Sequence, residues 1–320
     1  MGVRQISLIK LKENIAHNNK LYFITGDIAP TVLELAVGLA YNKEMIRDLE
    51  LDNPYDLHKN NEWTWENFFK LCKNVWSDQG DPGVDNYDRY GWVADGVMWD
   101  VAYHSIGQRL VEKNIDNQLV ISEDLRDDKT ATFASKLKEF YASKDVLKAV
   151  APVEEDFNPF NNGDVLFVTH YMDRSYSNFD WGVMPPPKYD SAQTRYYTLQ
   201  NMNYSQFSVP YDTPSFEISG AVLEYLAMES YRTVTPALFE QTFKTQMANA
   251  PEDAEMFEVI RASITWDFGR IYGEPLGGIY SAFRKVIGNG YEIGSFLKAT
   301  EETAIIKLGD ILLTLEELKR

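Results

Sequence analysis

The side chains most often used in catalysis are few in this sequence. It contains four histidines and a single cysteine, Cys72. No histidine lies in a His-Glu-x-x-His pattern or in the setting of a Ser-His-Asp triad, so neither zinc hydrolysis nor nucleophilic catalysis is indicated. No Gly-x-Gly-x-x-Gly or Gly-x-x-x-x-Gly-Lys-[Ser/Thr] loop is present, which removes the usual dinucleotide- and triphosphate-binding motifs. Cys72 falls within the aromatic helical pattern of residues 65–76 and is predicted to be a buried thiol.

An acidic loop over residues 78–88 is the candidate metal site. Its carboxylates Asp81, Asp85 and Asp88 fit the fifth, ninth and last positions of a calcium loop, in which carboxylates converge on a hard cation. Gln79 would take the third position, but serine replaces aspartate at the first position and proline replaces the turn glycine. A solvated acidic loop is the default interpretation, and bound calcium is the alternative.

The many carboxylates could also serve a glycoside-processing enzyme, in which two of them face each other across a sugar. With 48 aspartates and glutamates some close pair is inevitable, and no spacing singles one out. Glycoside hydrolysis therefore stays an alternative without assigned residues.

A strand followed by a polar turn is the most informative stretch, over residues 162–188. Residues 165–168 are β-branched and aromatic, as in a buried strand. His170, Tyr171 and Arg174 follow in what reads as a turn, where α/β proteins commonly place ligand contacts. Tyr171 is the strongest candidate, because an aromatic side chain in a polar turn has little reason to lie in the core.

Charge and composition restrict the partners. The formal net charge of −17 argues against a nucleic acid, which needs a basic footprint, and disfavours an anionic membrane surface. The 44% apolar and 25% charged residues are typical of an ordinary soluble globular protein, and 320 residues predict about two domains. The first twenty residues lack the apolar core and cleavage site of a signal peptide. Either the protein is cytoplasmic or the printed start is not the natural one.

The predicted elements alternate between strands and helices up to residue 210 and are helical afterwards, which indicates an α/β class with a helical C-terminal third. Residues 30–41 are apolar throughout and fit a buried strand, a buried helix, or one followed by the other. Thr64 is predicted to cap a helix. Strands are expected at 20–25, 90–94 and 165–168, and helices at 65–75, 130–141, 214–231, 236–248, 252–272, 277–288 and 293–318.

Several sequence blocks, in order, resemble the extracellular solute-binding proteins of carbohydrate ABC importers, the family that includes maltose-binding protein. The block Phe179-Asp-Trp-Gly-Val-Met-Pro-Pro-Pro-Lys188 is similar to the sequence that leads toward the hinge in that family. No single block is diagnostic, and their order carries the resemblance. The other blocks are residues 20–27, 41–45, 53–57, 62–66, 88–91 and 222–230.

The resemblance implies a periplasmic-binding-protein-like fold of type II, in which two α/β lobes close on a sugar. This chain would be mostly the second lobe, with most of the first lobe lying upstream. The implied divisions are the end of the first lobe and the hinge strand at 1–27, the second lobe at 28–204, a return segment of the first lobe at 205–249, and C-terminal helices of the second lobe at 250–320.

The family pattern also implies where a sugar would be contacted. Trp99 has four apolar neighbours and fits the core equally well, and Arg174 could instead pair with an acid. The implied ligand contacts are Asp27, Asp95, Trp99, His170, Tyr171, Arg174 and Tyr280.

By this resemblance the protein captures a sugar or oligosaccharide for import, docks on the membrane permease subunits of an ABC importer and catalyses nothing. No cofactor is implied, and the full-length form would be an extracellular lipoprotein on the cell surface. The alternatives are a carbohydrate-recognition or sensor module without a transport role, a glycoside-processing enzyme, and a degenerate product without a ligand.

Overall fold

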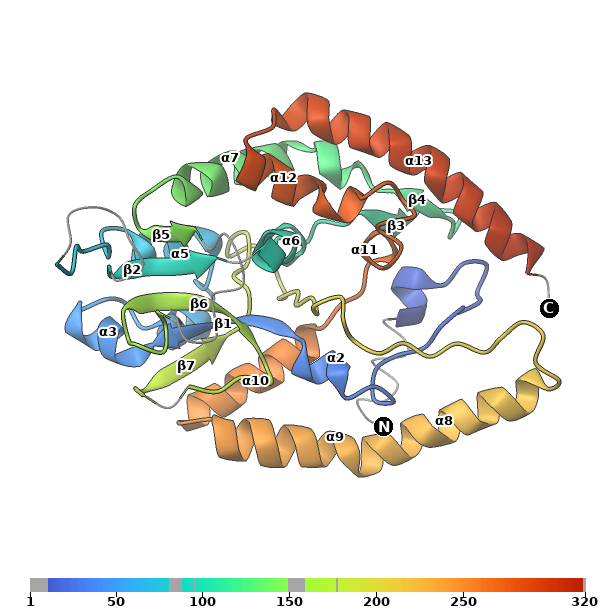
Figure 1. The fold of residues 1–320 in the computed structure, drawn as a ribbon, viewed down its shortest axis with the longest axis horizontal. Coiled ribbons are helices and arrows are strands. Elements are labelled where there is room, and N and C mark those ends of the chain that lie inside the picture. The colour runs from blue at the N-terminus through green and yellow to red at the C-terminus, as the bar shows by residue number, and fades with distance from the viewer. Residues whose placement is uncertain (1–10, 81–87, 95, 149–158, 177, 319–320) are drawn as a thin grey trace.

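A mixed β-sheet forms the centre of the computed structural model, which describes residues 11–80, 88–94, 96–148, 159–176 and 178–318 (Figure 1). In this part of the chain the main sheet has five strands in the order β5-β2-β6-β1-β7. β2 runs parallel to β5 and β6, whereas β1 is antiparallel to β6 and β7. The strands are β1 (Val37–Asn42), β2 (Tyr90–Ala94), β5 (Val146–Lys148), β6 (Val165–Tyr171) and β7 (Trp181–Met184).

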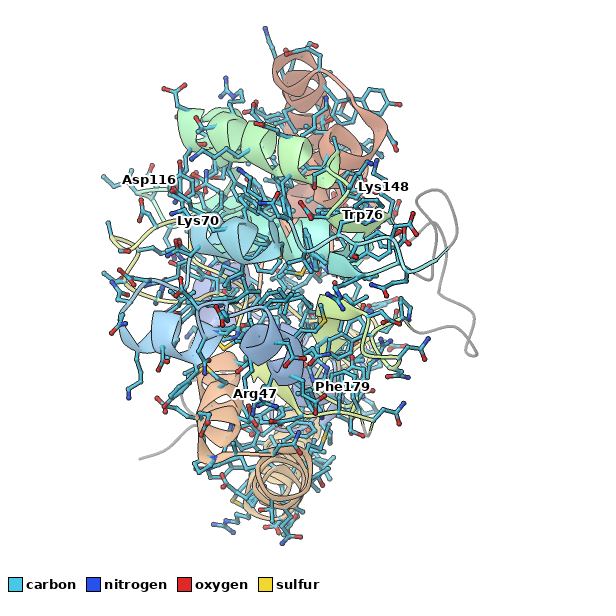
Figure 2. All side chains as sticks on the ribbon, turned by 90° about the vertical axis from the view of Figure 1, so that its left-hand side faces the viewer. Arg47, Lys70, Trp76, Asp116, Lys148 and Phe179 are labelled. Atoms are coloured by element: carbon cyan, nitrogen blue, oxygen red, sulfur yellow. The ribbon has the colours of Figure 1, made fainter. Side chains whose placement is uncertain are left out.

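Helices cover both faces of this sheet. Every residue of β1, β2 and β7 is buried, which explains why these strands, apart from Asn42 at the end of β1, are continuously apolar rather than alternating. Helices α5 and α7 pack against β2 and β5, and α3 and α10 pack against β7. Figure 2 shows the layers from the side, with Trp76 and Lys148 in the upper half and Arg47 and Phe179 in the lower half. These helices are α3 (Lys43–Asp48), α5 (Trp65–Cys72), α7 (Asp128–Tyr141) and α10 (Pro251–Ser263).

Aromatic side chains fill the core between α5 and the sheet. The Phe68 ring lies 5.1 Å from that of Trp92 and 5.0 Å from that of Phe167, both with edge-to-face tilt. The predicted cap of α5 is confirmed, since Thr64 accepts a hydrogen bond from the Asn67 amide. Cys72 is fully buried as predicted, and burial raises the pKa of its thiol well above the usual value.

A second group of elements lies above and to the right of the sheet in Figure 1. The long helix α13 contacts α12, α7 and the hairpin β3–β4, and α12 also packs on α6. This group consists of α6 (Gly96–Ser105), β3 (Val111–Lys113), β4 (Leu119–Ile121), η1 (Glu123–Arg126), α11 (Phe268–Ile271), η3 (Ile279–Ser281), α12 (Ala282–Asn289) and α13 (Ile293–Glu317).

Helix α8 (Phe216–Arg232) extends along the lower edge of the molecule and contains no buried residue (Figure 1). It continues through α9 (Val234–Pro236) into the π-helical segment η2 (Ala237–Met247), which packs against α10. None of the described helices is long and apolar enough to cross a bilayer.

The structure decides between the expectations for residues 30–41, because a short helix α2 (Thr31–Glu34) is followed by β1. Two predicted elements are corrected. Residues 20–25 contribute only two isolated bridges, from Lys20 to His17 and from Ile24 to Phe207, instead of a sheet strand. The predicted helix 252–272 is divided, since α10 ends at Ser263 and Thr265 joins Thr198 through backbone hydrogen bonding before α11 begins. α4 (Pro54–Lys59), capped by Asn53, was not predicted.

Candidate ligand-binding site

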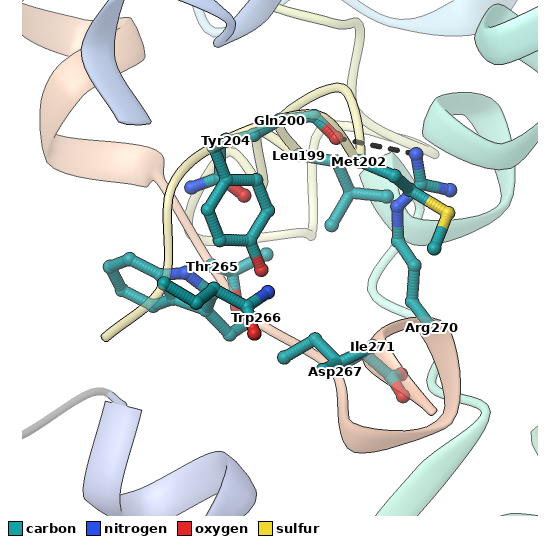
Figure 3. Close-up of a pocket in the computed structure, with 10 residues that line it drawn as sticks. Leu199, Gln200, Met202, Tyr204, Thr265, Trp266, Asp267, Arg270 and Ile271 are labelled. Carbon is teal, nitrogen blue, oxygen red and sulfur yellow. Dashed lines mark hydrogen bonds between the residues drawn. The ribbon is translucent and has the colours of Figure 1, made fainter. Parts of the chain in front are cut away.

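A small pocket of about 80 Å³ lies between residues 199–206 and 265–271 (Figure 3). Backbone hydrogen bonds hold the two segments side by side: the Thr198 amide donates to the Ser263 carbonyl, and the Thr265 amide donates to the Thr198 carbonyl. The first segment is also tied to the sheet, because the Val37 amide donates to the Leu199 carbonyl. The pocket is therefore built on anchored backbone.

Two residues that line this pocket each carry a buried donor without a hydrogen-bond partner in the described part of the chain. Gln200 is 2% exposed and leaves its Nε2 unpaired, and Trp266 is 3% exposed and leaves its Nε1 unpaired. Buried polar groups are nearly always hydrogen-bonded, because an unpaired one costs about 1–3 kcal/mol. Both groups can only donate, so a molecule presenting hydroxyl or carbonyl oxygens would satisfy them.

Arg270 forms a fixed wall of the pocket. Its Nη2 donates to the Gln200 carbonyl at 3.2 Å, the dashed line in Figure 3, and its Nη1 donates to Asp100 at 2.8 Å. Asp100 is 2% exposed and also accepts from Arg284 at 2.5 Å. The charge of Arg270 is thus balanced inside the protein, and its position is set by partners on α6 and on the 199–206 segment.

Asp267 anchors the second segment. Its carboxylate accepts from the backbone amides of Leu110 at 2.7 Å, Val111 at 3.3 Å and Gly269 at 2.7 Å. Burial raises the pKa of this carboxyl, while Arg109 and the three amides oppose the shift. With its oxygens engaged in this way, Asp267 acts as a connection between β3 and α11 rather than as a free acid.

Aromatic surface completes the pocket. Trp266, which is 3% exposed, and half-buried Tyr204 both line it, and the flat face of Tyr204 suits the C–H surface of a sugar ring. Burial raises the pKa of Tyr204 to about 12, opposed by Arg270 and by a hydrogen bond with Gln206, so its hydroxyl remains protonated at neutral pH. An aromatic face together with amide, hydroxyl and indole donors is typical of a site that binds a neutral polyol.

The structure places Tyr171 beside Asn201 of the 199–206 segment, outside the pocket lining and not in a turn. β6 extends through Tyr171, so the expectation that residues 169–171 form a turn is corrected. Tyr171 is 8% exposed and belongs to the buried core cluster, so the expectation that it lies outside the core is wrong. Its hydroxyl accepts a hydrogen bond from Asn201, the neighbour of Gln200, at 3.3 Å. The guanidinium of exposed Arg174 lies 4.6 Å from the Tyr171 ring centre. These two predicted residues are brought together.

His170 and Trp99 lie in the core. Successive strand residues point to opposite faces, which separates His170 from Tyr171. The His170 ring is fully buried near Tyr176 and Trp181, and burial, helped by Arg174, lowers its pKa to about 3. Trp99 is 4% exposed and packs edge-on against Trp92 and Tyr141.

The remaining predicted contacts have other partners. Half-buried Asp27 accepts from Thr235 of α9 at 3.1 Å. Half-buried Tyr280 donates to Glu274 at 2.7 Å. Asp95 lies outside the described residues.

Two of the three predicted calcium ligands, Asp81 and Asp85, also lie outside the described residues. Asp88 is 1% exposed and accepts hydrogen bonds from the Trp76 indole at 3.1 Å and the Gln79 amide at 3.2 Å. Elsewhere in the described ranges no group of three or more His, Cys, Asp or Glu side chains is arranged to hold a metal ion. The calcium site stays a prediction.

Four residues that line the pocket were not predicted from the sequence: Gln200, Tyr204, Trp266 and Arg270. A weak signal existed, since residues 189–205 combine polar and aromatic side chains without the period of a helix or strand. The sequence Thr265-Trp266-Asp267 likewise interrupts the helical pattern around it.

Comparison with known proteins gives the fold of the chain. Neither a protein-family model nor a curated protein sequence matches it. Among solved structures, an ABC substrate-binding protein from Listeria monocytogenes in complex with cycloalternan matches 92% of this chain and 74% of its own, with 14% identity and a TM-score of 0.57. The sugar-binding protein MalE from Xanthomonas citri matches 95% and 76%, with 13% identity and a TM-score of 0.58.

A third neighbour is the cyclic α-maltosyl-1,6-maltose binding protein from Arthrobacter globiformis, which matches 96% of this chain and 82% of its own, with 13% identity and a TM-score of 0.57. The chain therefore has the α/β, periplasmic-binding-protein-like fold of sugar-binding ABC solute-binding proteins, which confirms the fold predicted from the sequence. Sequence identity of 13–14% shows a shared fold but assigns no binding residue to this chain.

Proposed function

We propose that this protein binds a sugar or oligosaccharide for import by an ABC transporter. The observation that carries the proposal is the pair of buried donors on Gln200 and Trp266, which lack partners among the described residues and belong to two residues that line the pocket. The solved structures of the same fold support it, since those named above are sugar-binding proteins or hold a carbohydrate. These neighbours are binding proteins, which favours capture over catalysis.

The pocket would hold one edge of the ligand. Its volume of about 80 Å³ is below the usual ~300 Å³ or more of a small-molecule site, so a sugar ring would extend outward across Tyr204 and exposed Met202. The Gln200 amide and the Trp266 indole would donate to sugar oxygens, and the Tyr204 ring would cover the C–H surface. Tyr171 and Arg174 do not line the pocket, so they would contact only a ligand that extends beyond it, past Asn201.

Closure of two lobes around the ligand would then signal occupancy to the permease subunits. For the lobes we propose the divisions predicted from the sequence, 1–27 and 205–249 belonging to the first lobe and 28–204 and 250–320 to the second. The protein would act outside the cytoplasm, as a cell-surface lipoprotein in its full-length form.

Isothermal titration calorimetry with maltotriose, ribitol and glucose tests the proposal. The variant Trp266→Phe keeps an aromatic ring and removes the indole donor, and we expect it to weaken binding about 2- to 10-fold, the effect of one neutral hydrogen bond. Trp92→Phe is the matched control, because the Trp92 indole is also buried and unpaired among the described residues but does not line the pocket.

Tyr171→Ala tests the contact predicted from the sequence in the same titration, and we expect affinity to fall. Absence of heat with all three probes, or equal weakening by Trp266→Phe and Trp92→Phe, contradicts the proposed site. Each variant is compared at a temperature well below its own unfolding midpoint, so that loss of fold is not mistaken for loss of binding.

A further inference from the structure

A second pocket, of about 300 Å³, lies beside the first and shares Thr265 with it. Arg109 and Arg195 both line this second pocket, together with Tyr196, Tyr197 and the apolar side chains of Val259 and Ile264. Its size falls at the lower end of the range for small-molecule sites, about that of a single sugar-sized group. Two guanidinium groups in one pocket are notable in a chain with 48 acidic and 31 basic residues.

Both guanidinium groups are held against Tyr197. The Arg109 Cζ atom lies 5.2 Å from the ring centre, and the Arg195 Cζ atom lies 4.7 Å from it. The Arg195 Nε also donates to the Tyr197 hydroxyl at 2.8 Å. Arg109 is fixed further by hydrogen bonds to the Thr265 hydroxyl at 2.9 Å and the Trp266 carbonyl at 3.2 Å. The cationic groups are therefore positioned before any ligand arrives.

Neither arginine forms an ion pair within the described residues, although the charge of Arg109 acts on the buried Asp267 carboxylate from beyond ion-pair distance. No carboxylate there lies within ion-pair distance of Arg109 or Arg195, although Glu13 also lines the pocket from an exposed position. The two terminal amino groups of Arg195 make no hydrogen bond in that part of the chain either, which leaves a planar fork of donors. Carboxylate and phosphate groups match such a fork with two parallel hydrogen bonds.

We propose that this second pocket binds a small oxyanion, the carboxylate or phosphate group of a sugar-sized organic molecule or free phosphate. The arginine pair would hold the oxyanion, while Tyr196, Val259 and Ile264 would contact the less polar part of the molecule. The inference rests on the arginines and is independent of the neutral sugar pocket.

Calorimetry at low ionic strength with D-glucuronate, inorganic phosphate and D-glucose tests the proposal. We expect one or both anions to bind, and Arg195→Gln to weaken that binding about 10-fold or more, as for the loss of hydrogen bonds to a charged group. Glucuronate binding without phosphate binding identifies an organic carboxylate, and the reverse identifies a phosphate. Arg232→Gln, an exposed charge change on α8, is the matched control.

Failure of both anions to bind the wild-type protein overturns the proposal. Equal weakening by Arg195→Gln and Arg232→Gln overturns it as well, because the effect would then be one of overall charge. Trp266→Phe retains the backbone carbonyl to which Arg109 donates, so we expect it to leave anion binding unchanged while it weakens sugar binding. The proposed sugar site and the proposed anion site can therefore be disproved independently.

Discussion

His170 is a buried residue whose neutral form is required by the fold. Its ring is fully buried, its Nε2 has no partner among the described residues, and its pKa is lowered from 6.5 to about 3. Below pH 6.5 the unfolded chain therefore takes up a proton that the folded chain does not, so stability is complete above that pH and falls toward pH 3. We expect His170 to contribute a loss of about 2 kcal/mol in the free energy of unfolding between pH 7 and pH 5.

Urea unfolding of the wild type and His170→Phe at pH 7 and pH 5 measures this contribution. Phenylalanine retains an aromatic ring and does not titrate, so its stability should depend less on pH. Some dependence should remain, because burial also lowers the pKa of His104. An unchanged difference between the two pH values in His170→Phe would mean that the histidine is protonated in the fold.

The sequence predicted which kinds of side chain would form the site better than it predicted which residues would form it. Tyr171 was identified because an aromatic residue follows an apolar run, and it lies beside the pocket segment. His170 was grouped with it by proximity in the sequence, whereas the two-residue period of an extended strand buries it on the other face. Gln200 and Trp266 owe their importance to missing partners, which depend on contacts distant in the sequence.

At the scale of the elements, the close approach of α5 to β2 leaves no room for a side chain at Gly91. A Cβ atom on Gly91 of β2 would lie 2.5 Å from the Cys72 carbonyl oxygen and 2.9 Å from the Cys72 Cα atom, at the end of α5. The backbone of α5 would have to move, and such overpacking costs typically about 1–3 kcal/mol. We expect Gly91→Ala to lower the free energy of unfolding by at least this amount.

Gly309→Ala is the matched substitution with the opposite expectation. Gly309 lies in the exposed part of α13, and a Cβ atom there would meet no heavy atom within 4 Å. Because alanine favours a helix interior, stability should rise by about 0.5–1 kcal/mol. Chemical denaturation of both variants measures the contrast, and a loss of stability in Gly309→Ala would show that α13 does not have this environment.

Helices were predicted correctly where a helix cap or an amphipathic period was clear in the sequence. The Thr64 cap and the amphipathic period of α7 depend on neighbours in the sequence, and both are present. A single helix was wrongly predicted over residues 252–272. The helical period of α10 is followed there by Ile264, which forms an extended bridge with Thr198. Pairing between distant segments decided that conformation, and no local pattern reports it.

At the scale of the whole molecule, burial is uneven. One continuous core cluster connects the sheet helices with α13, from Leu11 to Leu315. By contrast α8 buries no residue, and Ile218 and Tyr225 are 67% and 59% exposed. Burial of apolar side chains supplies most of the stability of a helix within a protein. Helix α8 should therefore be the least protected long helix in the described part of the chain.

Hydrogen exchange followed by mass spectrometry measures this difference, and a matched pair of leucines tests its energetic basis. We expect amides of α8 to exchange by local opening and amides of β6 only by global unfolding. Leu226→Ala in α8, where the side chain is 48% exposed, should change stability by less than about 0.5 kcal/mol. Leu137→Ala in α7, where the side chain is fully buried, should cost about 2–5 kcal/mol. Strong protection of α8, or a large cost for Leu226→Ala, would show that this helix packs against another surface in solution.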